Sequence, residues 1–325
     1  MPLMRFLLDA EQLAFADSLD AMLTAADTPS AVREWSRGEH TSGRALWSRI
    51  AEAGVFALAV PEEYGGLGAR PVELTVAFVE LGRYAAPGPL VETVAAAALL
   101  AGLDDTGPAK RLLPALASGE AMATLASEGS CALDGDMAAT RLSLTSDGLR
   151  LAPGHGAVRP SLDPARRLTP LAPGGELLAS DPPVGLGLTW ARLATAAQAL
   201  GVGLALLDRT VSYVKQRTQF GVPIGSFQAV KHRLADAKIA LEFARPVLFG
   251  AALTLAPADV AAAKVTACEA AYATARTALQ LHGAIGYTAE YDLSLWLTKA
   301  RALRTAWGGP RECWALVLSG GDRRW

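Results

Sequence analysis

The segment Arg217–Gln228 contains the densest set of side chains suited to binding a ligand. It reads Arg-Thr-Gln-Phe-Gly-Val-Pro-Ile-Gly-Ser-Phe-Gln, so one Arg, two Gln and two Phe fall within twelve residues. Together these side chains suit a flat, charged ligand, because aromatic rings stack on it while the guanidinium and the amides pair with its charge. The alternative is a plain helix corner, in which Gly and Pro make the turn and the Arg is a solvated charge. The residues alone leave both interpretations open.

A second segment with closely spaced glycines is Gln280–Tyr287, with the sequence Gln-Leu-His-Gly-Ala-Ile-Gly-Tyr. Gly283 stands where a long helical pattern ends, which is the expected place for a helix cap. A cap explains Gly283 but not the whole run.

Long helical patterns flank both segments. Apolar residues recur at helical spacing over 191–215, 227–255, 257–282 and 291–305, and a final helical piece follows over 311–318. Four long helices in antiparallel order predict a bundle. Asp259 is expected to cap the third of them. That helix also has a face of small residues that permits close packing: Ala263, Ala267, Ala270, Ala271 and Ala275.

Residues 1–119 predict a separate helical domain. Asp9 and Gln12 form a capping pattern ahead of an amphipathic helix, and further helices are expected over 42–53, 72–84, 90–101 and 109–118. The helix at 90–101 is apolar on every face and should be buried. The Pro and Gly residues of the stretch from Leu58 to Gly68 predict a turn-rich loop without regular structure.

Residues 120–185 differ in character from the helical segments. Thr and Ser alternate with Leu over 140–145, a turn is expected at 146–148, and a second strand follows at 149–151. Two more strands are expected near 167–171 and 176–180. The sequence thus predicts a mainly α protein with a small β middle domain at 120–185 and a helical domain at 186–325.

Composition excludes several function classes. The 325 residues are 51% hydrophobic, and 30 basic and 32 acidic residues leave a net charge of -2, which predicts neither a nucleic-acid partner nor a membrane surface as partner. Three Cys and four His have no paired or metal-ligand spacing, so no disulfide scaffold and no metal site are expected. Met1–Leu8 is too short for a signal peptide, and the apolar run Val94–Leu103 is too short to span a membrane. We expect a cytoplasmic protein.

Three segments resemble the acyl-CoA dehydrogenase family. Arg217–Gln228 is similar to the family's Arg-x-x-Phe-Gly-x-x-(Ile/Leu)-x-x-(Phe/His)-Gln signature, Val60–Gly68 to its Val-Pro-Glu-Glu-(Tyr/His)-Gly-Gly-Leu-Gly loop, and Gln280–Tyr287 to its Gln-x-x-Gly-Gly-x-Gly-(Phe/Tyr) turn. The resemblance implies an N-terminal helical domain, a reduced β domain and a C-terminal four-helix bundle. It also implies contact with FAD that is bound mainly by a neighbouring subunit. The residues it assigns to this contact are Arg217, Gln219, Phe220, Phe227, Gln228, Gln280, Gly283 and Ala284.

The parts that contact the flavin ring in the family do not carry over. The family's first loop of the middle domain contains a Pro, whereas the matching run Ala123–Gly129 has none. The strand expected to carry a Trp reads His-Gly-Ala-Val-Arg-Pro at 155–160. The resemblance therefore implies that this chain holds the flavin ring poorly.

The family's catalytic base is also missing. Oxidation of an acyl thioester needs a carboxylate to remove the α-proton while the flavin accepts a hydride. Gly308 stands where the commonest catalytic glutamate of the family lies, and Ala191 stands where other members carry it. We expect no catalytic residue in this chain.

Two hypotheses follow from the resemblance. In the first, the chain is a subunit of a heteromeric acyl-CoA dehydrogenase, an α2β2 heterotetramer in which a sister subunit supplies the base and shares its FAD. Its substrate is then a bulky acyl-CoA of steroid or cholesterol catabolism. In the second, a stand-alone protein has lost dehydrogenation and serves in binding, hydration-type chemistry or structure. The survival of Arg217 without a base favours the first hypothesis, and a full-length sister chain in a neighbouring gene would support it.

Overall fold

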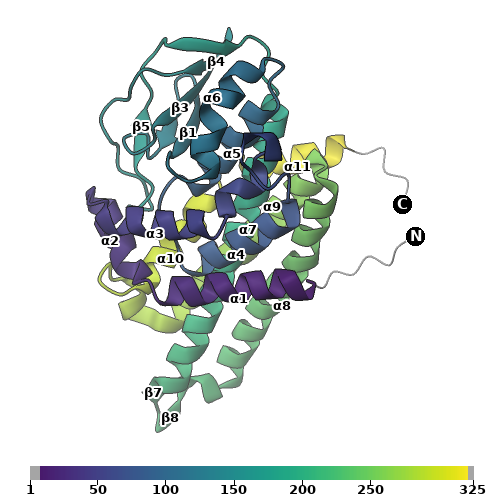
Figure 1. The fold of residues 1–325 in the computed structure, drawn as a ribbon. Coiled ribbons are helices and arrows are strands. Elements are labelled where there is room, and N and C mark those ends of the chain that lie inside the picture. The colour runs from purple at the N-terminus through teal and green to yellow at the C-terminus, as the bar shows by residue number, and fades with distance from the viewer. Residues whose placement is uncertain (1–7, 321–325) are drawn as a thin grey trace. The chain divides into compact units, whose positions relative to one another are not determined.

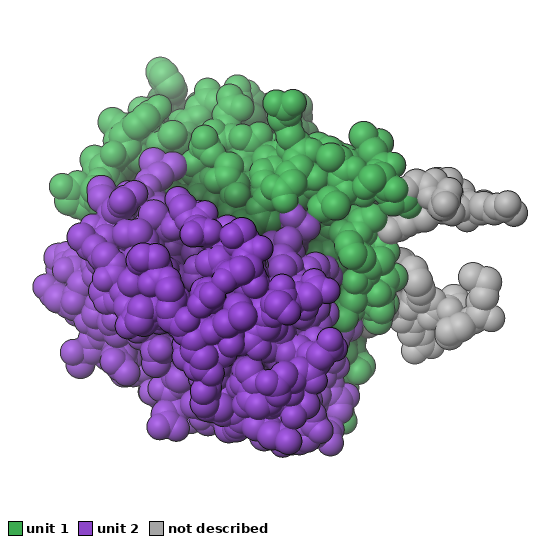
Figure 2. Space-filling model, turned by 90° about the horizontal axis from the view of Figure 1, so that it is seen from above, with its two compact units in different colours: residues 1–24, 75–86, 195–325 green, residues 25–74, 87–194 purple. Residues whose placement is uncertain are grey.

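The computed structural model describes residues 8–320 and divides into two compact units (Figures 1 and 2). Unit 1 comprises the described parts of 1–24, 75–86 and 195–325, and unit 2 comprises 25–74 and 87–194. Each unit combines segments that are far apart in the sequence. The three sequential domains at 1–119, 120–185 and 186–325 stay a prediction. The expectation for Met1–Leu8 falls on residues 1–7, which lie outside the described residues.

Unit 2 contains most of the helices expected in the N-terminal part and one that the sequence analysis missed. Three of them lie within a few residues of the predicted ranges: α3 (Thr41–Glu52), α5 (Leu90–Ala101) and α6 (Thr106–Ala117). Helix α5 is buried along its length, as its uniform apolar character predicted. The missed helix is α2 (Thr28–Arg37), which Asp27 caps by accepting a hydrogen bond from the Ser30 amide at 3.3 Å.

The segment predicted as an irregular loop is more ordered than expected. It contains the end of one short 3₁₀ helix, η1 (Val55–Ala59), and the whole of another, η2 (Glu62–Tyr64). Backbone hydrogen bonds close it, since the Gly68 amide donates to the Val60 carbonyl at 2.9 Å. The Pro and Gly residues therefore exclude a long helix or strand here but not single helical turns.

The β structure of unit 2 is a four-stranded sheet in the order β1-β3-β4-β6, with a separate antiparallel pair β2-β5. The predicted hairpin is β3 (Thr140–Thr145) and β4 (Gly148–Leu151), paired antiparallel with Leu142 opposite Leu151. The other predicted strands are β5 (Leu168–Pro170) and β6 (Glu176–Ala179). Two strands were not predicted, β1 (Ala123–Ser127) and β2 (Cys131–Leu133), and β1 runs parallel to β3.

Unit 1 is helical (Figure 1), and most of its long helices follow the predicted ranges, although α7 begins at Val184, seven residues before the predicted start at 191. It contains the whole or the larger part of α1 (Ala10–Thr24), α4 (Pro71–Arg83), α7 (Val184–Gln216), α8 (Gln228–Thr254), α9 (Pro257–His282), α10 (Leu293–Leu303) and α11 (Pro310–Ser319). The predicted small-residue face of α9 is buried, as close helix packing requires. Trp296 is fully buried in the core between α7, α9 and α10, and its indole N–H donates to the Arg83 carbonyl at 2.8 Å.

One predicted helix cap is confirmed and another is wrong. The Gln12 amide donates to the Asp9 carboxylate at 2.8 Å, and the Asp9 amide donates to the Gln12 side chain at 3.1 Å, which is the predicted reciprocal capping pair. Asp259 does not cap α9, because Ala256 occupies the N-cap position. Asp259 lies in the first turn instead, where its carboxylate accepts a hydrogen bond from the Thr254 hydroxyl at 2.8 Å.

Helix α7 is longer than the apolar run Val94–Leu103, which is too short to span a membrane. Val184–Gln216 is long and apolar enough to cross a membrane by length and composition alone. However, 94% of its most apolar stretch is buried inside the protein, which is how the core helix of a globular protein appears.

Candidate cofactor-binding site

The Arg217–Gln228 corner forms a β-hairpin and a 3₁₀ turn at the ends of α7 and α8 (Figure 1). β7 (Thr218–Gln219) and β8 (Val222–Pro223) pair antiparallel and leave Phe220 and Gly221 at the tip. Phe220 has a φ of 52° and Gly221 a φ of 79°, so both lie in the left-handed region that a tight two-residue hairpin turn requires. The predicted corner is thus a protruding hairpin with a phenylalanine at its tip.

The five candidate residues of the corner are all exposed. The Phe220 side chain is 91% exposed, and its ring meets the Phe227 ring edge-on with the centroids 6.3 Å apart. Among residues 8–320, no hydrogen bond or ion pair engages the Arg217 guanidinium. An arginine without an internal partner beside two open rings is available to a ligand from outside the chain.

The second segment borders a cavity of about 650 Å³ in unit 1. Gln280, at the end of α9, and Gly283, at the start of η4 (Gly283–Tyr287), both line it. Gly283 has φ 63° and ψ -137°, a conformation that residues with side chains avoid. A Cβ at Gly283 would meet no atom within 4 Å, so the space beside this backbone is open. Ala284 is exposed but does not line the cavity.

Two arginines that the sequence analysis did not single out line the same cavity. They are Arg233 on α8 and Arg276 on α9. Arg233 donates a hydrogen bond to the Gln280 side-chain oxygen at 2.7 Å. The described residues provide no hydrogen bond or ion pair for the Arg276 guanidinium. Two guanidinium groups around an open glycine backbone are suited to phosphate oxygens.

The structure brings some of the predicted residues together and not others. Gln280 and Gly283 share the cavity, whereas no residue of the corner lines it. Tyr213 links the two regions, since its hydroxyl donates to the His282 carbonyl at 3.3 Å and its ring stacks on the His282 ring at 4.1 Å. Burial lowers the pKa of His282 below its usual value, so its imidazole is neutral at pH 7. A neutral aromatic contact therefore connects the ends of α7 and α9.

Neither of the two positions at which the resemblance places the family's base carries an ionisable group. Ala191 is a fully buried alanine on α7. Gly308 lies in the turn before α11 with a φ of 118°, and its carbonyl accepts a hydrogen bond from the buried Lys264 ammonium at 2.7 Å. A Cβ at Gly308 would lie 3.1 Å from a carboxylate oxygen of Glu312. A side chain at this position would therefore be strained by its backbone and crowded by Glu312.

The segments that match the flavin-ring contacts also differ from the family pattern. The run Ala123–Gly129 was expected to be a loop, but 123–127 form strand β1 in the four-stranded sheet. The run 155–160 forms only two isolated bridges, His155 with Leu171 and Arg159 with Leu168. Neither run contains Phe, Tyr or Trp. These segments thus offer no Phe, Tyr or Trp ring to a flavin.

The cysteines give no sign of redox or metal chemistry. Within residues 8–320, no group of three or more His, Cys, Asp or Glu side chains is placed to hold a metal ion. Cys131, Cys268 and Cys313 are free thiols. Burial raises the pKa of Cys268 to about 11, which keeps that thiol protonated and unreactive.

Comparison with known proteins decides the family. Residues 9–120 match the model of the acyl-CoA dehydrogenase N-terminal domain, and residues 184–318 match that of the C-terminal domain. The acyl-CoA dehydrogenase IpdE2 of Mycolicibacterium smegmatis is 34% identical over 306 residues, which cover 93% of this chain and 96% of that protein. The chain belongs to the acyl-CoA dehydrogenase family. The family recognised from the three sequence segments is thereby confirmed.

Another relative and two solved structures are also similar to this chain. IpdE2 of Mycobacterium tuberculosis is 36% identical over 288 residues, covering 87% of this chain and 89% of that protein. Among solved structures, the ChsE4-ChsE5 complex of Mycobacterium tuberculosis has a TM-score of 0.85 at 25% identity, with 99% of this chain and 100% of that chain covered. A variant of the Tcur3481-Tcur3483 steroid ACAD has a TM-score of 0.80 at 26% identity, with 96% and 99% covered. The predicted acyl-CoA dehydrogenase fold is confirmed.

Proposed function

We propose that this chain is the non-catalytic subunit of a heteromeric FAD-dependent acyl-CoA dehydrogenase. The observation that carries the proposal is the turn at Gly308, which has no base and no unstrained room for one. The corner at Arg217 supports the same proposal, because its side chains are exposed and the guanidinium has no internal partner among residues 8–320. A chain that keeps contacts for the cofactor and lacks the base fits an enzyme in which another subunit performs the chemistry.

The residues of this chain fit the dinucleotide end of FAD. The Arg217 guanidinium would pair with phosphate oxygens, and the Phe220 and Phe227 rings would stack on an adenine. Gly283 would admit the pyrophosphate close to the backbone, with Arg276 adding positive charge from α9. When bound, FAD supplies the hydride acceptor of the family's reaction. In the proposed enzyme, the α-proton is removed by a glutamate of the sister subunit, while this chain binds and orients the dinucleotide.

The proposed substrate and assembly draw on the relatives. One similar structure is named a steroid ACAD, and another is a complex of two proteins. We infer a bulky, steroid-derived acyl-CoA as the substrate and a sister acyl-CoA dehydrogenase chain as the partner, in an α2β2 heterotetramer with shared FAD. We also propose a cytoplasmic location, where CoA thioesters are consumed.

Co-expression tests the proposal. Produced alone, the chain should be colourless or poorly soluble, because its interface and its flavin-ring site are incomplete. Produced with the sister chain, it should yield a yellow complex that contains fewer flavins than chains, as measured by flavin absorbance and native mass. If the chain purified alone carries one tightly bound FAD per subunit and oxidises an acyl-CoA, the division of labour proposed here is wrong.

A further inference from the structure

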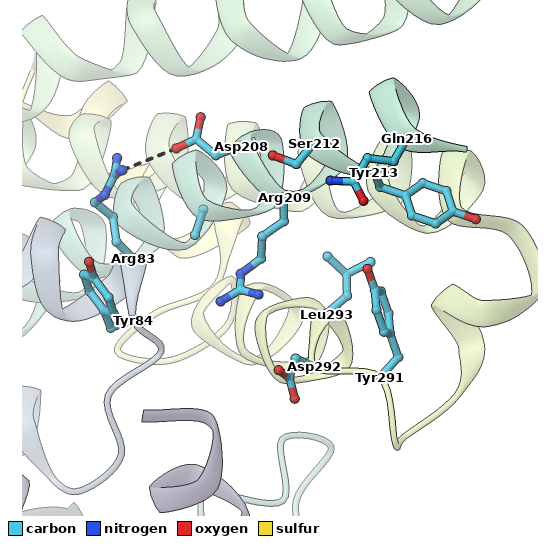
Figure 3. A pocket seen from close by; sticks show the side chains of 11 residues that line it. Arg83, Tyr84, Asp208, Arg209, Ser212, Tyr213, Gln216, Tyr291, Asp292 and Leu293 are labelled. Atoms are coloured by element: carbon cyan, nitrogen blue, oxygen red, sulfur yellow. Dashed lines mark hydrogen bonds and ion pairs between the residues drawn. The ribbon is translucent and has the colours of Figure 1, made fainter. Parts of the chain in front are cut away.

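Unit 1 contains a second cavity that is separate from the candidate cofactor site (Figure 3). Its volume is about 440 Å³, and it lies between the second half of α7, the end of α4 and the turn at the start of α10. It shares no residue with the 650 Å³ cavity or with the Arg217–Gln228 corner. A volume of this size lies within the range of small-molecule sites, roughly 300–1,000 Å³.

Arg209 is the arginine of this cavity that forms no ion pair with a described residue. Its guanidinium lies over the ring of the fully buried Trp296, with Cζ 3.7 Å from the ring centroid. In residues 8–320, no hydrogen bond or ion pair engages this guanidinium, and Asp292 attracts it only from beyond ion-pair distance. Since the Trp296 ring covers one face of the planar group, its edge N–H donors stay available to a ligand.

The other charged groups of the cavity are already engaged. Arg83 donates to the Asp208 carboxylate at 3.3 Å, the contact drawn as a dashed line in Figure 3, and it also lies 3.5 Å from the Glu80 carboxylate. Asp292 has a partner of its own. The lining carries two arginines and two aspartates, so its formal charges balance, and Arg209 is the arginine whose N–H donors no hydrogen bond or ion pair of residues 8–320 engages.

Neutral groups around Arg209 complete the cavity. Ser212 and Gln216 follow at helical spacing on the same side of α7, and both are exposed (Figure 3). Leu293 and the Tyr291 ring form an apolar wall across from α7. The Arg209 guanidinium, two hydrogen-bonding side chains and an apolar wall together suit a small organic anion. We propose that this cavity binds the phosphate or carboxylate group of a small organic molecule, with Arg209 as the principal contact.

The experiment uses the full-length protein in its native assembly, saturated with FAD. Calorimetric titration with inorganic phosphate, adenosine 5′-monophosphate and citrate should show one site per chain for at least one of the three. Arg209→Gln should weaken this binding by about 10- to 100-fold, the change expected for loss of a charged bidentate contact. Arg49→Gln removes the same charge from an exposed position on α3 and should leave the affinity unchanged. Arg217→Gln should also leave it unchanged, which separates this site from the cofactor site.

A second variant guards against a folding defect in Arg209→Gln. Ser212→Asp places a negative charge in the cavity without touching the contact between Arg209 and Trp296, and it should weaken anion binding by at least about 10-fold. Citrate binding alone would identify a carboxylate as the ligand, and phosphate or nucleotide binding would identify a phosphate. The inference is overturned if none of the three anions binds at millimolar concentration. It is also overturned if both variants bind as tightly as the wild type.

Discussion

The corner at Arg217–Gln228 and the turn at Gly308 have opposite local structures. In the corner, Phe220 is 91% exposed and, among residues 8–320, nothing pairs with the Arg217 guanidinium. In the turn, the Gly308 carbonyl is held by Lys264 at 2.7 Å, and the Glu312 carboxylate borders the space that a side chain would fill. One segment is open to an external ligand, and the other is closed by groups of its own chain.

The difference shows what a side chain at position 308 would meet. A side chain that had merely been deleted would leave a hole, and a single substitution would fill it again. At Gly308 the backbone has a φ of 118° and neighbouring polar groups occupy the surroundings. If the proposed loss of the base is correct, a single substitution at Gly308 should not restore the chemistry. The exposed corner has no such obstacle.

The largest expected effect concerns catalysis at the turn of Gly308. In a complex whose sister chain has lost its catalytic glutamate, Gly308→Glu in this chain should restore no turnover, although a positioned base contributes typically about 10²–10⁴-fold. The reasons are the strained backbone at Gly308 and the missing flavin-ring contacts. Acyl-CoA oxidation by the purified complex measures this. Gly309→Glu is a matched control for folding, because a Cβ at Gly309 would meet nothing within 4 Å. Turnover from the Gly308→Glu complex would show that a base can work at this turn, which contradicts the prediction.

The second largest effect concerns FAD retention by the Arg217–Gln228 corner. Arg217→Ala should weaken retention of FAD in the complex by about 1.5–3 kcal/mol, the usual value of a charged hydrogen bond, without unfolding the chain. Gln228→Ala should act in the same direction and more weakly, because its amide is neutral. Flavin remaining after dialysis gives the measurement. Lys238→Ala, at an exposed position on α8, is the control for loss of a positive charge. Equal retention by all three variants and the wild type would make the corner a plain helix turn.

A third prediction separates the stability of the turn at Gly308 from FAD binding at the Arg217–Gln228 corner. Lys264→Met removes the donor to the Gly308 carbonyl and leaves that oxygen without this partner, which should lower the free energy of unfolding by about 1–3 kcal/mol. Retention of FAD should change little, since Lys264 does not belong to the corner. Urea unfolding and flavin dialysis of the same samples separate the two outcomes. A loss of flavin without a loss of stability would place Lys264 in the cofactor site.

The last prediction concerns Glu80, which lies outside both regions and serves as a reference. Burial raises the pKa of Glu80 to about 7 from 4.5, against the opposing effect of Arg83. As the pH rises above 4.5 the unfolded chain loses this proton first, so stability falls between about pH 4.5 and 7 and is then constant. Glu80→Gln should remove a fall of about 1–3 kcal/mol between pH 5 and 8, measured by urea unfolding. An unchanged pH dependence would contradict this, and flavin retention should be the same as in the wild type.

Much of the fold could be predicted from local signals. The range of α5 was predicted correctly because a uniform apolar run is bounded by Pro89 and Gly102, and α9 because Pro257 and Gly283 mark its ends. Helix α2 was missed although Asp27 and Pro29 signal its start, because its ten residues are short and largely polar. Strand β1 was missed because its parallel partner, β3, follows it only after an intervening segment that contains β2.

The candidate site could be predicted only where residues are close in sequence. The corner and the run at Gln280 have compact motifs, and both were found. Arg233 and Arg276 are 43 residues apart on two helices, and the pairing of α8 with α9 brings them to one cavity. Arg209 and Trp296 are further apart still, and no periodicity links them. Sites assembled by tertiary packing leave no local pattern in the sequence.

The left-handed Phe220 at the hairpin tip has a consequence for directed evolution. A phenylalanine with a φ of 52° costs roughly 1 kcal/mol relative to glycine or asparagine, and its ring is almost fully exposed in this chain. A thermal screen of random variants should therefore enrich Phe220→Gly and Phe220→Asn. The heat-resistant clones would then be those that have lost the aromatic tip, so selection for robustness alone would drive the protein away from its proposed partner.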